Sequence, residues 1–247
     1  MLILSHSPDL LQMLWGNGHL CIKRQWHDIF EPVAIQEILR LLEQEYGPRE
    51  WHANEDPLDV LIGTILSQNT SDANSGRAFA ALKASFDNWE AVAAAPVEHI
   101  AEVIKSGGLS RIKAARIKQV LERIQKDRGC ISLDFLKSKT TDEAEQYLLG
   151  LPGIGRKTAR CVLLFSLGKP SLPVDTHIFR VAKRLGLIGT NTSVEKAHKL
   201  LQEQIPRAKV YQFHVHMIEH GRRICRARQP RCQRCIFRGI CPSSFCS

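Results

Sequence analysis

Residues 151–187 read LPGIGRKTARCVLLFSLGKPSLPVDTHIFRVAKRLGL, and this stretch decides the fold. A Pro-Gly-Ile-Gly turn precedes an apolar helical segment that begins near Arg156, and the segment before the turn is helical as well. The stretch therefore predicts two helices joined by a tight turn, a helix-hairpin-helix at about residues 141–167. Gly153 and Gly155 suit the turn, because glycine allows a sharp change of direction and leaves no Cβ between the main chain and a ligand.

The turn also predicts a phosphate-binding site. Backbone N–H groups at the start of a helix are free to donate, and the positive end of the helix dipole favours an anion there. We therefore expect Gly153, Ile154, Gly155 and Arg156 to hold the DNA backbone, a contact that carries no base-sequence information. An ordinary corner between two helices, with glycines used for packing, is the alternative.

Lys157 stands in the first turn of the second helix, where the dipole and the neighbouring Arg156 both disfavour a protonated amine. A neutral amine is a nucleophile, so Lys157 is a candidate for covalent catalysis, whereas a surface lysine that binds phosphate is the alternative. Asp175 precedes the segment THIFRVAKRLGL and is expected to cap that helix. A carboxylate facing the lysine across a pocket would also stabilise the cationic sugar formed when a glycosidic bond breaks. His177 is expected to be structural.

Four of the eight cysteines lie close together near the C-terminus, in the spacing C-x6-C-x2-C-x5-C. Four thiolates can bind a tetrahedral zinc ion or a [4Fe–4S] cluster, and this spacing alone favours the cluster only modestly. Several arginines lie between the cysteines and are predicted to bind phosphate, with a solvated basic loop as the alternative. The cysteines are Cys225, Cys232, Cys235 and Cys241, and the arginines are Arg226, Arg228, Arg231 and Arg234.

The composition of the whole chain agrees with a nucleic-acid partner. The 247 residues carry a net charge of +9, with 44% apolar and 24% charged residues. Such a basic balance without long single-sign blocks indicates a folded protein with a polyanionic partner, nucleic acid before membrane, although a basic enzyme without such a partner is the alternative. No stretch approaches the roughly 20 apolar residues of a membrane span, and the first residues lack a signal-peptide pattern. We expect a monomer with no membrane partner, located in the cytoplasm with the nucleoid, or in a nucleus.

Helical periodicity dominates the rest of the chain and predicts an all-α protein with short connections. Caps and apolar stripes mark the expected helices, and the first 32 residues give no decisive pattern. Helices are expected over residues 32–46, 58–68, 96–105, 111–128 and 196–205, in a segment from Asp72, and in the segment that leads to Leu149. Asp56 and Pro57 mark the start of the second of these helices, and Gly129 ends the one over residues 111–128. Capping boxes of Thr140 with Glu143 and of Thr192 with Glu195 mark the starts of the segment before Leu149 and of the helix over residues 196–205.

The motifs LPGIGRKTA, VDTHIFRVAKRLG and the cysteine spacing occur in this order, and together they resemble the endonuclease III family of helix-hairpin-helix DNA glycosylases with a Gly-Pro-Asp loop. The resemblance covers about residues 33–247 and leaves residues 1–32 as an N-terminal extension. It implies two helical domains that flank a DNA-binding cleft. One is a six-helix barrel of residues 50–169, and the other is an iron–sulfur cluster domain of residues 33–49 and 170–247, in which the four cysteines hold a [4Fe–4S] cluster.

The resemblance also implies an activity: base-excision repair by a bifunctional DNA glycosylase and AP lyase, acting on double-stranded DNA that contains a damaged base or an abasic site. Lys157 matches the Schiff-base lysine of the family and Asp175 its catalytic aspartate. Relatives that remove adenine or mismatched thymine carry another residue type at the lysine position. Oxidised pyrimidines are the first expectation for the base. Removal of mismatched thymine or uracil, removal of 5-methylcytosine, and a non-catalytic DNA-binding protein are the alternatives.

Two segments are expected to act inside the damaged duplex. Leu109 matches the wedge of the family and would fill the space left by the flipped nucleotide, whereas a core leucine at a helix start is the alternative. Residues 67–72 read SQNTSD where the family often has SAQATD, so either Gln68 or Asn69 is expected to reach the orphaned base. Gln229 stands where many relatives have a basic residue.

Overall fold

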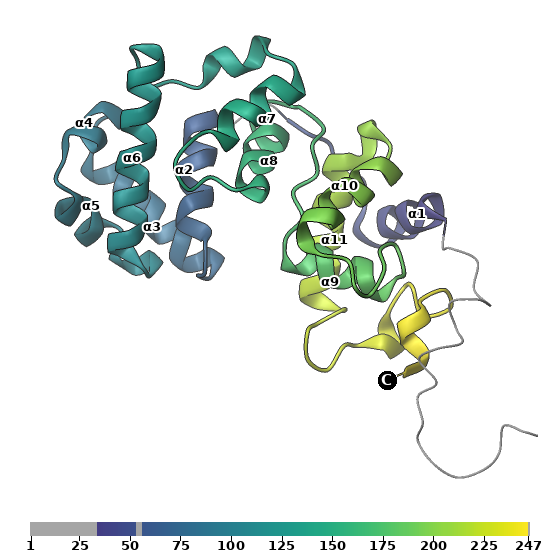
Figure 1. Ribbon diagram of the computed structural model, residues 1–247. Coiled ribbons are helices and arrows are strands. Elements are labelled where there is room, and N and C mark those ends of the chain that lie inside the picture. Colours follow the sequence, from purple (N-terminus) through teal and green to yellow (C-terminus); the bar gives the residue numbers. More distant parts are fainter. Residues whose placement is uncertain (1–33, 53–55, 247) are drawn as a thin grey trace, which may run out of the picture.

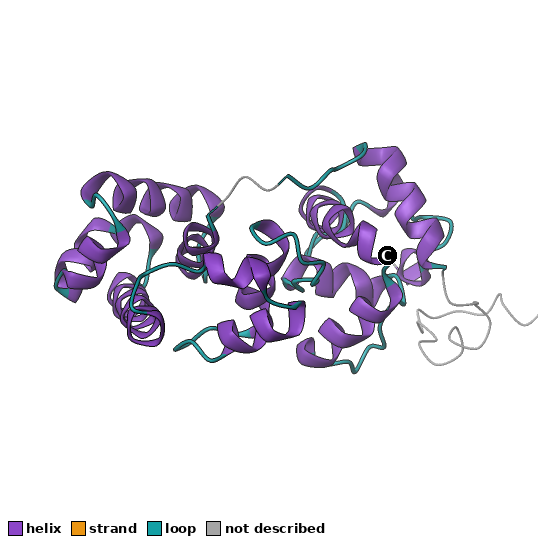
Figure 2. Ribbon diagram, turned by 90° about the horizontal axis from the view of Figure 1, so that it is seen from above, coloured by secondary structure: helices purple, strands orange, loops and turns teal. Residues whose placement is uncertain are grey.

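The structure, a computed structural model, describes residues 34–52 and 56–246. The expected N-terminal extension, residues 1–32, lies outside these described residues. Within them every regular element is a helix and no strand occurs, so the all-α prediction is confirmed (Figure 2). No helix of this part of the chain combines the length and the apolar character that crossing a membrane requires.

The helices form two lobes (Figure 1). Each lobe has its own cluster of buried apolar side chains. The first lobe is continuous in sequence, and its core includes Leu61, Ile65, Ile117 and Leu121, all fully buried. Its helices are α2 (Pro57–Ser67), α3 (Asp72–Ser85), α4 (Trp89–Ala94), α5 (Val97–Val103), α6 (Ser110–Arg128), α7 (Thr141–Leu149) and α8 (Arg156–Phe165).

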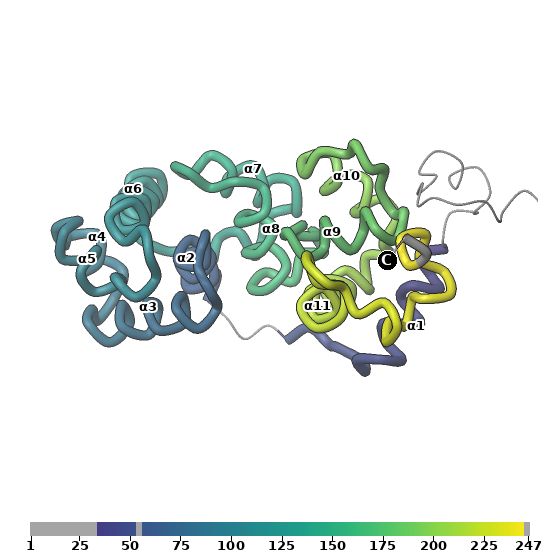
Figure 3. Tube along the Cα trace, turned by 90° about the horizontal axis from the view of Figure 1, so that it is seen from below, coloured from purple at the N-terminus to yellow at the C-terminus, as the bar shows by residue number. Residues whose placement is uncertain are grey.

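The second lobe combines the beginning and the end of the described chain. The apolar face of its first helix, with Ile38 and Leu42, belongs to one core with Phe213, Met217 and Phe237. Figure 3 shows this N-terminal helix, in purple, close to the yellow C-terminal segment. This lobe contains α1 (Ile35–Tyr46), α9 (Thr176–Arg184), α10 (Val194–Gln204), α11 (Val210–Arg223) and the short 3-10 turns η7 (Cys232–Arg234) and η8 (Pro242–Cys246) near the cysteines.

Side-chain caps account for most helix starts. Asp56 accepts from two backbone N–H groups at the start of α2, and the Thr140–Glu143 capping box is present in full at α7. The capping box expected at Thr192 and Glu195 is wrong, because the N-cap of α10 is the next residue, Ser193. Ser193 has the extended backbone of an N-cap and accepts from the N–H of Lys196 at 3.2 Å, while the N–H of Thr192 is used in a turn to Gly189 O. Both residues carry a hydroxyl, so the turn before the helix decides which one caps.

The chain crosses between the lobes twice, and the two connecting segments contact each other. Trp51, on the first crossing, donates from Nε1 to the carbonyl of Phe165 at 3.2 Å. Its ring lies against Gly168 on the second crossing, where φ is +61° and a Cβ would come within 2.6 Å of the indole. A residue with a side chain would be strained there and would displace Trp51, so the position requires glycine. An ion pair of 2.6 Å between Arg222 of α11 and Asp72 of α3 also links the lobes.

Candidate active site and DNA interface

The predicted hairpin is formed by α7 and α8. Gly153 has φ +68° in the turn between them, and the N–H of Ile154 bonds to the carbonyl of Leu151 at 3.2 Å. Gly155 is the N-cap of α8, and no side chain caps this helix. A Cβ at Gly155 would meet no atom within 4 Å, so the space in front of the helix start is open. Free N–H groups at an open helix N-terminus can bind a phosphate.

The side chains of Ile154 and Arg156, the other two hairpin residues expected to contact DNA, are both engaged within the protein. Ile154 is only 6% exposed, so its side chain belongs to the first core and only its backbone is available at the turn. The guanidinium of Arg156 forms ion pairs with Glu145 at 3.4 Å and Glu195 at 3.0 Å. Arg156 is therefore held by carboxylates as it stands and would have to exchange these partners to contact DNA.

Lys157 and Asp175 lie around the same two buried side chains. Burial raises the pKa of the Cys161 thiol, and the charges of Lys157 and Asp175 act on it in opposite directions. The same two charges act on His214 of α11. Asp175 also fulfils its predicted capping role, because its Oδ1 accepts from the N–H of Ile178 at 2.7 Å. The lysine at the head of α8 and the carboxylate at the head of α9 thus face a common region.

His214 is neutral at physiological pH. Burial lowers the pKa of its imidazole to about 4, against the opposing effect of Asp175. Its Nδ1 lies 3.0 Å from the carbonyl oxygen of Pro173, and because a carbonyl only accepts, Nδ1 carries the proton. In the neutral ring the other nitrogen, Nε2, is then a hydrogen-bond acceptor.

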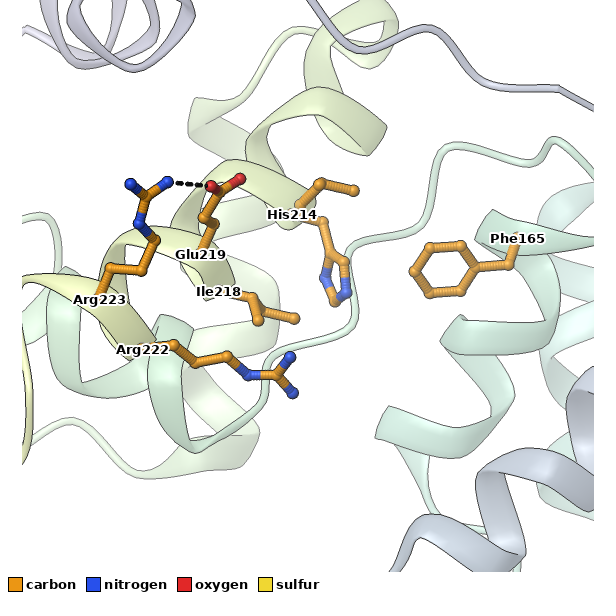
Figure 4. Close-up of a pocket in the computed structure, with 7 residues that line it drawn as sticks. Phe165, His214, Ile218, Glu219, Arg222 and Arg223 are labelled. Carbon is orange, nitrogen blue, oxygen red and sulfur yellow. Dashed lines mark hydrogen bonds and ion pairs between the residues drawn. The ribbon is translucent and has the colours of Figure 1, made fainter. Parts of the chain in front are cut away.

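A cavity of ≈ 430 Å³ opens between the lobes beside His214 (Figure 4). Phe165, at the end of α8, forms one side, and α11 forms the other. The rings of Phe165 and His214 meet edge to face, with centroids 5.2 Å apart. The remaining lining residues are Val215, Ile218, Glu219, Arg222 and Arg223. A cavity with an aromatic ring, apolar side chains and a few polar groups is typical of a ligand site.

Leu109 is the N-cap of α6, and Gln68, which contacts Arg116 of α6, precedes Asn69 in the segment after α2. Leu109 has φ +50° and is 53% exposed, so the alternative of a core leucine is wrong. Asn69 also has a positive φ of 54° and is exposed, whereas Gln68 is half-buried and its Oε1 accepts from Arg116. Non-glycine residues at positive φ are uncommon and concentrate at functional sites.

The four cysteines are brought together around one small cavity. Arg184 NH1 donates to Cys225 Sγ at 3.3 Å, and His220 Nε2 lies 3.5 Å from Cys235 Sγ. No three His, Cys, Asp or Glu side chains of the described residues form a ready site for a metal ion. An arginine donor aimed at sulfur stabilises a thiolate, and four thiols are a donor set that a metal cluster can use. The predicted arginines of this loop, Arg226, Arg228 and Arg231, are exposed, and none forms an ion pair with an acidic residue of the described chain.

Several residues of the site have no motif of their own. Cys161 stands four positions after Lys157, on the same face of α8, so helical spacing could have indicated it. Thr64 of α2, which also acts on the Cys161 thiol, has no such signal. Neither Phe165 nor His214 has one, because only the packing of α8 against the second lobe brings them together.

A helical protein with an open hairpin turn, and with a lysine and an aspartate whose charges both act on a histidine of an inter-lobe cavity, belongs to the class of helix-hairpin-helix DNA glycosylases. Residues 62–207 match the HhH-GPD superfamily of base excision DNA repair proteins, and the chain belongs to that superfamily. Within it, the resemblance to endonuclease III is confirmed. Endonuclease III of Thermotoga maritima is 35% identical over 207 residues, which is 84% of this chain and 92% of that protein.

Other relatives and structures agree with this assignment. An Arabidopsis thaliana protein with the provisional name of DNA glycosylase is 39% identical over 171 residues, 69% of this chain. The chain spans 58% of the length of that plant relative. Two solved structures, a non-covalent endonuclease III–DNA complex and a trapped endonuclease III–DNA covalent intermediate, match with TM-scores of 0.74 and 0.73. Each is 30% identical, and each match covers 85% of this chain and 95% of the solved one.

Proposed function

We propose that this protein is a bifunctional DNA glycosylase and AP lyase that removes an oxidised pyrimidine from duplex DNA and then cuts the strand. The observation that carries the proposal is the placement of Lys157 and Asp175, whose opposite charges both act on Cys161 and on His214, and His214 lines the inter-lobe cavity. The likeness to a trapped endonuclease III–DNA covalent intermediate supports a covalent adduct with DNA.

In the proposed reaction the hairpin amides hold the backbone, and the damaged nucleotide leaves the stack, since its sugar cannot be reached inside the duplex. The nitrogen lone pair of Lys157 attacks C1′ and forms a C–N bond, while the glycosidic bond breaks and the base departs with its electron pair and takes up the proton that this nitrogen loses. Asp175 stabilises the positive charge that develops on the sugar. Opening of the sugar ring gives an iminium ion, which acidifies the C2′ proton. Loss of that proton expels the 3′ phosphate and cuts the strand.

A panel of duplexes, each with one modified base, tests this proposal. We expect strand cutting without alkali at oxidised pyrimidines, and a covalent protein–DNA adduct when borohydride is present. Base removal that leaves the strand intact until alkali is added would contradict the lyase part. Salt-dependent binding without base removal or cutting would instead indicate a non-catalytic DNA-binding protein.

We further propose that Cys225, Cys232, Cys235 and Cys241 hold a [4Fe–4S] cluster. When bound, such a cluster ties its ligand loops together and can exchange electrons. Arg184 provides a charge-assisted donor to Cys225 Sγ, and His220 Nε2 lies 3.5 Å from Cys235 Sγ. A second link is buried behind them: the hydroxyl of Tyr46 lies 2.9 Å from His220 Nδ1, so α1 is connected to a cluster ligand through one imidazole. The fixed loop would present its exposed arginines to phosphates.

Replacing a ligand tests the cluster directly. Cys232→Ala is expected to yield protein with little iron and sulfide, because three thiolates hold the cluster less well. Cys130→Ala is the matched control, since Cys130 is an exposed cysteine in the first lobe. Iron and sulfide per chain, with the visible absorption of the purified protein, are the measurements. Equal iron in both variants, or a single zinc per wild-type chain, would contradict the assignment.

A further inference from the structure

Cys161 is a buried thiol beside the proposed nucleophile, and the proposed reaction gives it no role. It lies four residues after Lys157 on α8, so the two side chains are neighbours on one face of the helix. Only 5% of Cys161 is exposed. Its thiol is hydrogen-bonded to Lys157 and to Thr64 of α2, the helix that packs against α8. Three polar side chains from two helices thus form a chain at the edge of the first core.

The directions of these hydrogen bonds follow from which groups can donate. The Thr64 hydroxyl lies 2.7 Å from the carbonyl oxygen of Val60, and because a carbonyl only accepts, the hydroxyl donates its single proton there. Toward the thiol, Thr64 Oγ1 can therefore only accept. Burial raises the pKa of Cys161, so the thiol keeps its proton at neutral pH and donates it to Thr64. The sulfur, with its S–H used in this way, faces Lys157 as an acceptor.

The bond between the sulfur and Lys157 decides which way the amine points. A neutral amine has two N–H groups and one lone pair, and only the lone pair can attack a carbon atom. An N–H donated to the buried sulfur leaves the lone pair directed away from the core. In the reverse arrangement, the S–H of Cys161 would donate to the amine and occupy its lone pair. Thr64 excludes that arrangement because it accepts the S–H itself.

We propose that Cys161 is a positioning residue for the nucleophile: its sulfur accepts one N–H of Lys157, and Thr64 holds the thiol in the direction that allows this. Because Lys157 is a nucleophile only in the proposed function, this role rests on that function. Neither Cys161 nor Thr64 needs to contact DNA. The backbone of α2 at Val60 is connected through these two side chains to the reacting nitrogen on α8.

The rate at which full-length protein forms the borohydride-trapped adduct with abasic-site DNA tests this role in a single turnover. Cys161→Val has a similar shape but no acceptor, so the amine is free to rotate and the adduct is expected to form about threefold more slowly. Thr64→Val removes the acceptor of the S–H, which then turns to the Lys157 lone pair, and the adduct is expected to form about tenfold more slowly. The Kd for a duplex with a non-cleavable tetrahydrofuran site is expected to keep its wild-type value in both variants.

The double variant separates an effect on the lone pair from an effect on packing. Thr64→Val combined with Cys161→Val has no S–H left to occupy the lone pair, so its adduct is expected to form about threefold faster than with Thr64→Val alone. A purely structural role predicts the opposite, since two neighbouring changes in the core would then slow the reaction further. Thr64→Ser retains the hydroxyl and is expected to react at nearly the wild-type rate.

Ser166→Ala is the matched control for the loss of a hydroxyl. Ser166 is buried at the end of α8, and its hydroxyl donates to the carbonyl four residues earlier at 2.6 Å, as that of Thr64 does. This variant is expected to form the adduct at the wild-type rate. Thermal denaturation checks that each variant is folded. If Thr64→Val is not, Cys161→Val is compared with Cys161→Ser, which keeps a donor and an acceptor and is expected to recover most of the rate.

The positioning role and the proposed function fail in different ways. A double variant slower than both single variants, or Cys161→Val that reacts at the wild-type rate, would overturn the positioning role and leave Lys157 as the nucleophile. A wild-type protein that forms no adduct would overturn the proposed function, and the positioning role with it. Cys161→Ser no faster than Cys161→Val would also overturn the positioning role, because serine restores the hydrogen bonds.

Discussion

Lys157→Gln is expected to abolish the borohydride-trapped adduct with DNA that contains an abasic site, and to lower strand cutting by more than about a thousandfold. The physical reason is that glutamine retains the length and polarity of the side chain but has no nucleophilic nitrogen. Lys157 is half-buried at the head of α8, beside the charged Asp175, so the loss of one positive charge is expected to change affinity for undamaged duplex only slightly. Adduct yield on a denaturing gel and single-turnover cutting are the measurements.

Lys126→Gln is the matched control for this variant, because Lys126 is exposed in the last turn of α6 and the chemical change is identical. It is expected to form the adduct at the wild-type yield. A Lys157→Gln protein that still forms a full yield of adduct would assign the nucleophile to another amine. A variant that loses the adduct and also all binding would point to a phosphate-binding role for this lysine.

Asp175→Asn is expected to slow base removal by about 10²–10³-fold while leaving the fold intact. The carboxylate has two roles, and asparagine separates them: its side-chain oxygen can still accept from the N–H of Ile178, but the negative charge that stabilises the cationic sugar is gone. Asp175→Ala removes both roles and is expected to be less stable by about 1 kcal/mol in addition. Single-turnover base release and thermal denaturation distinguish the two variants.

Asp56→Asn provides the control for capping alone, since Asp56 caps α2 through Leu58 N–H at 2.8 Å and lies at another helix start. We expect wild-type base release from this variant. If Asp175→Asn removes the base at the wild-type rate, the charge of Asp175 plays no part in the chemical step and its role is only to begin α9.

Local signals in the sequence were enough for the helices and for the residues at helix starts. The Asp56 cap, the Thr140–Glu143 box and the Gly129 end of α6 are all found where the sequence predicts them, because each depends on residues within one turn. Where the prediction is wrong, at Thr192, the neighbouring Ser193 offers the same chemistry and only the turn geometry distinguishes them. The motif around Lys157 likewise identifies the hairpin from adjacent residues alone.

Long-range packing explains what the sequence could not predict. His214 follows Asp175 by 39 positions and meets its charge only because α11 packs against α9. Its low pKa comes from burial, which no local pattern reveals. Arg116 resembles the other basic residues of α6, and only its contacts with Gln68 and Gly153 set it apart. The sequence also leaves open whether Leu109 is exposed or part of the core, because its environment depends on the packing of distant segments.

The division of the chain between the lobes has a consequence for how the protein is made. The first core draws on residues 58–163, a continuous run that can collapse while later residues are still being translated. The second core joins residues 38–46 to partners as distant as Cys241, so the apolar stripe of α1 has no native partner until nearly the whole chain has emerged. During that interval the apolar face of α1 lacks its native partners. Insertion of the proposed cluster, which would need Cys241, would follow the emergence of that residue.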